Sequence, residues 1–225
     1  MRKVYSVYES CSPEQFTLKG NRSFLRTDYE ISSIDKDEAD RAFKSCKKQY
    51  LGSLLKTNGF LQYKSNAYVR RNHVDVLEYI DLQKEKNGSR TFTVNYALTP
   101  LYLRYAFADF WYSERMGMLV CGKDVWWDYA NESISRDSFE NVARALEEYV
   151  LPWFDAHSNV DSIKKLLLAK ERLSVYQQAW LESIENPGDC SGIIEENIKL
   201  FGLPKSIGHD VGQRKQARGP KDRRL

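Results

Sequence analysis

Two stretches of alternating residues, joined by a short turn, constrain the fold of this chain more than any other feature. Residues 91–98 place an apolar or aromatic side chain at every second position, and residues 74–82 favour apolar side chains at even positions. A period of two puts alternate side chains on opposite faces of a β-strand. Residues 86–88 between them read Lys-Asn-Gly, which is typical of a turn because glycine accepts a positive φ. We therefore expect an antiparallel β-hairpin at the centre of the fold.

The alternation also predicts how the two strands pair. A slip of one residue would mix apolar and polar positions, whereas centring the hairpin on Asn87 keeps them on separate faces. This register leaves Glu78, opposite Tyr96, as the one charge on the apolar face. The apolar pairs expected are Leu82 with Phe92, Ile80 with Val94 and Val76 with Leu98, and the polar pairs are Gln83 with Thr91, Asp81 with Thr93 and Tyr79 with Asn95.

Composition indicates a folded chain whose positive charge is concentrated at one end. Hydrophobic residues make up 42% of the 225 residues and aromatic residues 13%, which excludes a wholly disordered chain. The formal net charge of +3 is too small to mark the whole molecule as a nucleic-acid-binding protein. Residues 214–225, however, hold six basic residues against one acidic residue. We therefore predict a basic flexible tail over residues 206–225, with a weak, salt-dependent attraction to nucleic acid.

Cysteine usage and hydropathy predict a cytoplasmic protein. Cys11, Cys46, Cys121 and Cys190 are far apart and form no Cys-x-x-Cys or Cys/His cluster, which is typical of reduced thiols. The residues after Lys3 lack the apolar run of a signal peptide, and no stretch approaches the ~18 apolar residues of a membrane span. We expect a cytoplasmic location without membrane contact.

No catalytic or cofactor motif occurs at its required spacing, so we expect no cofactor and no metal. The histidines have no carboxylate or nucleophile at a motif spacing, and we interpret them as loop residues. Residues 117–123 match most of a phosphate-binding loop, but Asp124 stands where a hydroxyl would hold magnesium, and its carboxylate would repel phosphate. The apolar residues inside this match favour a strand instead.

Outside the hairpin, periodicity predicts helices before and after the strands. Residues 37–56 carry an apolar stripe at helical spacing that includes Phe43 and Cys46. Strands joined by short turns, with helices on either side, predict an α+β fold with an antiparallel sheet of about five or six strands. The other elements expected are strands at 60–63, 67–71, 115–122 and 125–129, a loose helix at 101–112, a helix that starts at Asp137 and is ended by Pro152, and helices at 161–185 and 193–200. The regions expected are an N-terminal extension (1–35), a core domain (36–156), C-terminal helices packed on the core (157–205) and the tail (206–225).

Aromatic side chains offer a candidate binding surface. Trp126 and Trp127 are adjacent, so on a strand they would point to opposite faces. Either helices cover both, or one of them forms a stacking wall for a ligand or peptide. The aromatic residues at 102–112 have the same two interpretations, core packing or an interface.

Seven short motifs follow one another along the chain: Asn58-Gly-Phe60, Tyr68-Val-Arg70, Asp81-Leu-Gln-Lys84, Phe92-Thr-Val-Asn95, Arg115-Met-Gly117, Trp126-Trp127 and Leu151-Pro-Trp-Phe154. Their order resembles the bacterial family called domain of unknown function 4304, over about residues 37–170. The resemblance implies a compact α+β domain, bacterial and cytoplasmic, with no established activity. Tyr96-Ala97 departs from the family pattern, which has a glycine near this position. By position in these motifs, the resemblance singles out Arg70, Gln83, Asn95 and Arg115.

The hairpin register independently places Gln83 and Asn95 on one face. Arg70 would join them if the preceding strand pairs in register, and Arg115 and Trp127 complete the candidate site for a ligand or partner. Two amides and one or two guanidinium groups beside an indole can recognise a carboxylate, a phosphate or a peptide backbone. The alternative is that the amides satisfy nearby backbone groups.

Three functions stay open from the sequence. The first is a non-catalytic protein- or ligand-binding module, in its specific form an immunity-like protein that protects a bacterial cell by binding a toxin. The second is a small-molecule-binding enzyme that uses the polar face, which we favour less because Asp81 is the only credible base. The third is weak nucleic-acid contact through the basic tail.

Overall fold

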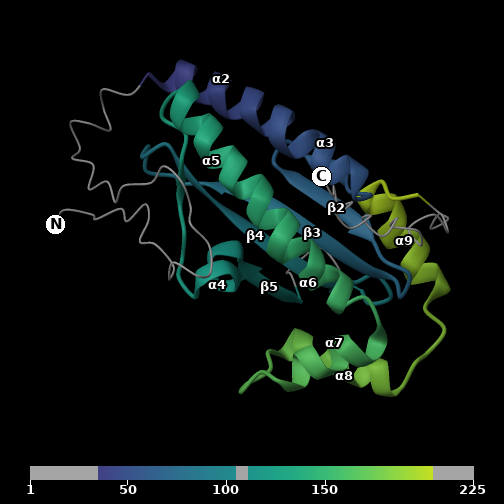
Figure 1. Ribbon diagram of the computed structural model, residues 1–225. Helices are drawn as coiled ribbons and strands as arrows, with labels where there is room; N and C mark the ends of the chain where they lie inside the picture. The colour runs from purple at the N-terminus through teal and green to yellow at the C-terminus, as the bar shows by residue number, and fades with distance from the viewer. Residues whose placement is uncertain (1–34, 105–110, 205–225) are drawn as a thin grey trace, which may run out of the picture.

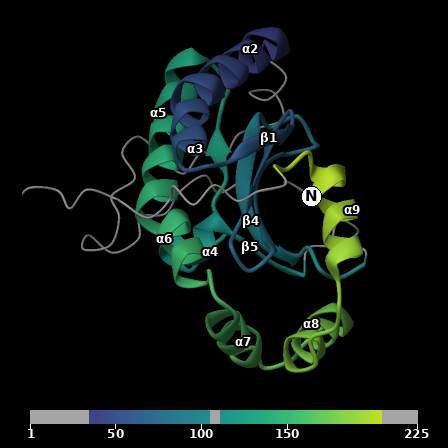
Figure 2. The ribbon, with the colours of Figure 1, turned by 90° about the vertical axis from the view of Figure 1, so that its right-hand side faces the viewer.

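A six-stranded sheet with helices on both of its faces forms the centre of the protein (Figures 1 and 2). The structure is a computed structural model that describes residues 35–104 and 111–204. The strands follow the order β1-β2-β3-β4-β5, all neighbours are antiparallel, and β6 pairs with the start of β4. The predicted α+β class is therefore confirmed. The strands are β1 (Leu61–Lys64), β2 (Ala67–Arg71), β3 (Val76–Lys84), β4 (Thr91–Pro100), β5 (Tyr112–Arg115) and β6 (Trp127–Asp128).

Two long helical segments cover one face of the sheet, and α9 covers part of the other (Figure 2). The helices α7 and α8 lie beyond one end of the sheet and lead from the first layer to α9 (Figure 1). The first long segment comprises α2 (Lys36–Cys46), the π-helical turn η1 (Lys47–Gly52) and α3 (Ser53–Thr57), and the second comprises α5 (Glu132–Ala145), η2 (Leu146–Val150) and α6 (Leu151–Ala156). The remaining helices are α4 (Met116–Cys121), α7 (Val160–Leu168), α8 (Val175–Glu185) and α9 (Ser191–Phe201).

The hairpin contributes to two buried layers, one on each face of the sheet, whereas the sequence predicts one apolar face and one polar face. Even-numbered hairpin residues such as Ile80 and Val94 are fully buried beneath the two long helical segments. Odd-numbered residues such as Leu77 and Ala97 pack on the opposite face against Phe201 of α9. We name these surfaces the even face and the odd face of the sheet.

The predicted register of the hairpin is wrong by two residues, although its faces are right. Leu82 pairs with Val94, not Phe92, and Ile80 pairs with Tyr96. Consequently Glu78 lies opposite Leu98. A slip of two leaves every side chain on its predicted face, so the polar–apolar pattern cannot distinguish the two registers.

The turn geometry explains the longer loop. Lys84 and Phe92 form the last pair, and the seven residues between them centre on Gly88 instead of Asn87. Gly88 and Arg90 both adopt positive φ, 88° and 58°, whereas the predicted turn over residues 86–88 would place Arg90 outside the turn, in the strand. The β6 strand also holds Phe92 through its pairing with Trp127, which fixes where β4 begins.

Residues 116–121 form the helix α4, where we had predicted a strand over 115–122. The helix ends at Gly122, whose φ of 69° is the left-handed conformation that glycine accepts at a helix end. Gly117 packs so closely that an added Cβ would lie 2.5 Å from the carbonyl oxygen of Lys123. The short strand predicted at 125–129 is present as β6.

The helix predicted to run from Asp137 to Pro152 is longer at both ends. It begins at Glu132, because the side chain of Asn131 accepts a hydrogen bond from the amide of Ile134 at 3.0 Å and caps the helix. Pro152 does not end it. The π-helical turn η2 ends at Val150, two residues before the proline, and across this wider turn the Leu151 amide donates to the Leu146 carbonyl. Pro152 then lies in the first turn of α6, where its missing N–H is tolerated.

The C-terminal helices depart from prediction at one point. The helix predicted at 161–185 is two helices, α7 and α8, joined by a link at residues 169–174. Ser174 and Gln177 form a capping box that starts α8. The predicted N-terminal extension, except Asp35, the predicted tail and most of the aromatic segment at 102–112 lie outside the described residues. The predicted boundary between core and C-terminal helices stays a prediction.

Candidate functional site

Four polar side chains from three neighbouring strands lie together on the odd face. Asp81 of β3 pairs with Asn95 of β4, which in turn pairs with Arg115 of β5. The Asn95 amide nitrogen donates to the Gln83 side-chain oxygen at 3.0 Å and lies 3.5 Å from an Asp81 carboxylate oxygen. The structure therefore brings together three of the sequence-predicted site residues, Gln83, Asn95 and Arg115. We call these four residues, with Asp124 and Trp126, the polar strip.

The loop after α4 holds the Arg115 guanidinium in place. An Arg115 Nη1 forms an ion pair with Asp124, and the guanidinium lies 5.0 Å from the centre of the Trp126 ring. The Trp126 indole nitrogen also donates to Asp124, at 3.1 Å. Asp124 thus fixes both the guanidinium and the indole beside it, and both are partly exposed. A guanidinium that is fixed by a carboxylate and lies on an indole still has free N–H donors to offer.

Burial raises the pKa of the Asp81 carboxyl above its usual range, and the hydrogen bond from Asn95 and the charge of Lys64 oppose this rise. Within the described parts of the chain, Asp81 forms no ion pair. Its carboxylate therefore has hydrogen-bonding capacity left for a donor from outside.

Arg70 and Trp127, the other two sequence-predicted site residues, lie on the even face and do not join the polar strip. Arg70 pairs in register with Glu78, which is only 1% exposed, and the two form an ion pair. An Arg70 Nη1 also donates to the Asn58 carbonyl at 2.9 Å. Trp127 is 1% exposed, and its ring centre lies 6.1 Å from that of Phe92. Trp127 therefore belongs to the packed core, and Arg70 is held at the edge of that core by Glu78 and, at 3.5 Å, by Asp155.

Sequence reasoning missed Asp124 as a site residue and favoured the wrong tryptophan. From the sequence, Asp124 was interpreted only as the residue that prevents residues 117–123 from forming a phosphate-binding loop. The adjacent tryptophans do point to different environments, as predicted, but the partly exposed one is Trp126. The pairing of Trp127 with Phe92, a core residue of β4, decides which tryptophan is buried, because directly opposed residues share a face of the sheet.

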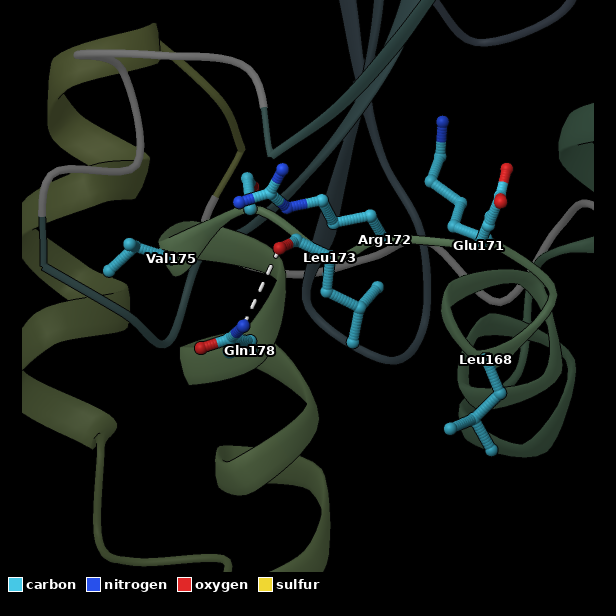
Figure 3. Close-up of a pocket in the computed structure, with 8 residues that line it drawn as sticks. Leu168, Glu171, Arg172, Leu173, Val175 and Gln178 are labelled. Atoms are coloured by element: carbon cyan, nitrogen blue, oxygen red, sulfur yellow. Dashed lines mark hydrogen bonds between the residues drawn. The ribbon is translucent and has the colours of Figure 1, made fainter.

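Two hollows lie away from the polar strip. The first, of about 650 Å³, is open and is formed by the link between α7 and α8, with Leu168 and Val175 on its rim (Figure 3). The second, of about 240 Å³, lies between α9 and the turn after β2, where Arg71 forms an ion pair with Asp75. Over residues 35–104 and 111–204 no group of three or more metal-ligating side chains occurs.

Comparison with known families adds one result. Residues 51–156 match the family model described as "Domain of unknown function (DUF4304)". This match confirms the resemblance seen in the sequence, over a narrower range than we predicted. It includes the whole polar strip and leaves out α7, α8 and α9. No curated protein and no solved structure matches the chain significantly. None of the described helices has both the length and the apolar character required to cross a membrane.

Proposed function

We propose that this protein is a non-catalytic binding module whose polar strip contacts a partner protein. The observation that supports this proposal is the geometry of Arg115, which Asp124 and Trp126 hold at a partly exposed position beside Asn95. Arginine and tryptophan are enriched among the residues that dominate binding energy at protein interfaces. Because the guanidinium and indole are already held together, little side-chain entropy would be lost on binding.

The charges of the polar strip indicate the chemistry of the partner. Asp81 carries a half-buried carboxylate, and Arg115 offers donors that Asp124 does not use. A complementary partner would present a basic side chain to Asp81 and a carboxylate or carbonyl to Arg115. The amides of Gln83 and Asn95 can accept and donate between these points.

The specific form of this proposal is the immunity-like one, in which a bacterial cytoplasmic protein binds and neutralises a toxin. A catalytic use of the same face is a weaker alternative, because it required Arg70 beside the amides and Arg70 lies on the even face. Nucleic-acid contact through residues 206–225 stays a prediction, since that segment lies outside the described residues.

A strip-dependent capture experiment tests the proposal. Wild-type protein is used to capture partners from extracts of the source cell over a range of ionic strengths, in parallel with an Arg115→Ala/Trp126→Ala variant. The matched control is Arg136→Ala, which removes an exposed arginine that pairs with Glu132 at 3.3 Å on α5. We expect a captured protein that wild type and Arg136→Ala retain and the strip variant loses. The affinity of that purified partner should likewise be similar for wild type and Arg136→Ala and weaker for the strip variant.

Two results would contradict the proposal. One is a partner that the strip variant binds as tightly as wild type does. The other is the absence of any captured protein at every ionic strength. Thermal unfolding of the variants shows whether a lost partner reflects a lost fold.

A further inference from the structure

Glu114 lies on the even face of β5, where two tyrosines hold its carboxylate. The Tyr96 hydroxyl donates to one carboxylate oxygen at 3.3 Å, and the Tyr112 hydroxyl donates to the other at 3.2 Å. Burial raises the pKa of both tyrosines, so their hydroxyls keep their protons and remain donors. The Tyr112 ring in turn stacks on Trp153, with ring centres 5.6 Å apart. The carboxylate is therefore fixed in orientation by packed aromatic residues.

The Glu114 side chain is nonetheless 37% exposed, and a lysine ammonium lies beside it. The Lys170 nitrogen is 3.6 Å from a Glu114 oxygen and 4.4 Å from the centre of the Tyr112 ring. A separation of 3.6 Å is longer than a normal hydrogen bond, so the ammonium is near the carboxylate without being tightly held. Each carboxylate oxygen also has a second lone pair that no tyrosine uses.

Lys170 comes from the link between α7 and α8, not from the sheet. Lys170 lines the open hollow of about 650 Å³ formed by that link. Glu171 and Arg172 line the same hollow (Figure 3). The Lys170 side chain is 30% exposed, so it has room to turn away from Glu114 into this open space. An aromatic face attracts an ammonium group, and a carboxylate beside it can accept a charge-assisted hydrogen bond from the same group.

We propose that Glu114 and Tyr112 form a binding site for a primary ammonium group, which Lys170 occupies as an internal ligand in the free protein. The incoming group is a primary amine, either a free alkylamine or a lysine side chain of another protein. It displaces the Lys170 ammonium and takes its position between the carboxylate and the Tyr112 ring. This site is independent of the polar strip, because neighbouring residues of β5 point to opposite faces.

The proposal predicts that removal of Lys170 strengthens amine binding. We would titrate n-butylammonium into wild type and Lys170→Ala and follow the nuclear magnetic resonance signals of the Tyr112 and Trp153 rings. In wild type the incoming amine must displace Lys170, whose ion pair with Glu114 is partly exposed and therefore weak. We therefore expect Lys170→Ala to bind n-butylammonium about fivefold more tightly than wild type. The matched control is Lys164→Ala, which removes a lysine that pairs with Glu185 at 2.8 Å and leaves Glu114 untouched. This control should bind as wild type does.

The charge of Glu114 is tested in the Lys170→Ala background. Adding Glu114→Gln keeps the shape and one acceptor oxygen but removes the negative charge, and we expect butylammonium binding to be lost. n-Butanol has the same apolar stem without the charge and should not bind Lys170→Ala, a measurement that does not depend on how well the glutamine variant folds. The proposal is overturned if Lys170→Ala binds no more tightly than Lys164→Ala, or if n-butanol binds as well as butylammonium.

A second ligand identifies the source of the amine. The peptide acetyl-Gly-Lys-Gly-amide presents the same ammonium on a polypeptide. Binding of this peptide to Lys170→Ala at least as tight as that of n-butylammonium would assign the site to a lysine of a partner protein. Binding of n-butylammonium alone would assign it to small amines, and binding of neither would overturn the proposal.

Discussion

Removal of Arg70 should destabilise the protein strongly at neutral pH, because it leaves Glu78 charged and buried. Glu78 is 1% exposed and forms an ion pair with Arg70, which also donates to the Asn58 carbonyl at 2.9 Å. Breaking a buried ion pair by removing one partner costs about 3–5 kcal/mol. For a chain of this size each kcal/mol lowers Tm by about 2–4 °C, so Arg70→Met should lower Tm by about 6–20 °C.

The pH dependence of this loss distinguishes a buried charge from lost packing. Burial raises the pKa of Glu78 above the ordinary 4.5, and Arg70 opposes the rise, so its removal raises this pKa further. A carboxyl with a raised pKa in the folded protein favours folding below its unfolded pKa, and this contribution is lost as the pH rises through the folded value. The deficit of Arg70→Met relative to wild type should therefore shrink as the pH falls from 7 to about 5.

Denaturant unfolding of four proteins at both pH values measures the effect. They are wild type, Arg70→Met, Arg70→Met/Glu78→Leu and, as the control, Arg136→Met. The double variant removes both charges and should recover most of the stability. Arg136 pairs with Glu132 on the surface at 3.3 Å, so the control should cost less than about 1 kcal/mol. A cost for Arg70→Met equal to that of the control, or a deficit independent of pH, would refute the reasoning.

Three further predictions concern packing and the tail. Gly117→Ala should destabilise the protein by about 1–3 kcal/mol in denaturant unfolding, because the added Cβ would lie 2.5 Å from the Lys123 carbonyl oxygen. Gly52→Ala should stabilise the protein by about 0.5–1 kcal/mol, because the space around Gly52 is open and alanine favours a helix. Trp127→Ala should cost about 3–5 kcal/mol, because Trp127 is fully buried, and Trp126→Ala less than about 1 kcal/mol; equal costs would contradict this assignment. Deletion of residues 206–225 should abolish retention on immobilised DNA at low salt, and unchanged retention would exclude the tail as the contact.

The faces of the hairpin could be predicted from the sequence, but its register could not. Alternation with a period of two assigns Ile80 and Val94 to the core in any register that shifts by an even number of residues. The choice among those registers depends on the loop, where Gly88 and Arg90 adopt positive φ. An arginine at such a position is not signalled by composition, since arginine has no particular preference for it.

Local backbone geometry that residue type does not reveal explains the errors in the helices. Residues 116–121 read as a strand because four apolar residues follow one another, yet the close approach of Gly117 to residue 123 and the left-handed Gly122 favour a short helix. Pro152 is a reliable helix-ending signal only when the preceding turn is α-helical, and here it is π-helical.

Only part of the candidate site could be predicted, because strand pairing decides which residues meet. Gln83 and Asn95 share a face by alternation alone, but their contact depends on the observed register, in which Gln83 pairs with Thr93 and not with Thr91. Arg70 required knowledge of how β2 pairs with β3, and the observed pairing with Glu78 places it at the edge of the core. The charge of Arg70 is paired with the buried carboxylate of Glu78, whereas the charge of Arg115 is paired with Asp124 at a partly exposed position.

Two adjacent residues of β5 connect the two proposed sites without coupling them. Glu114 faces the even side and Arg115 the odd side, because successive side chains of a strand alternate. Their partners also come from different parts of the chain, since Lys170 belongs to the link after α7 and Asp124 to the loop after α4. Substitutions at Glu114 should therefore alter amine binding and leave the polar strip intact, and substitutions at Arg115 should do the reverse. Coupled losses at both sites would mean that β5 itself is displaced, which the pairing of Tyr96 with Glu114 would report as a change in the Tyr96 ring signals.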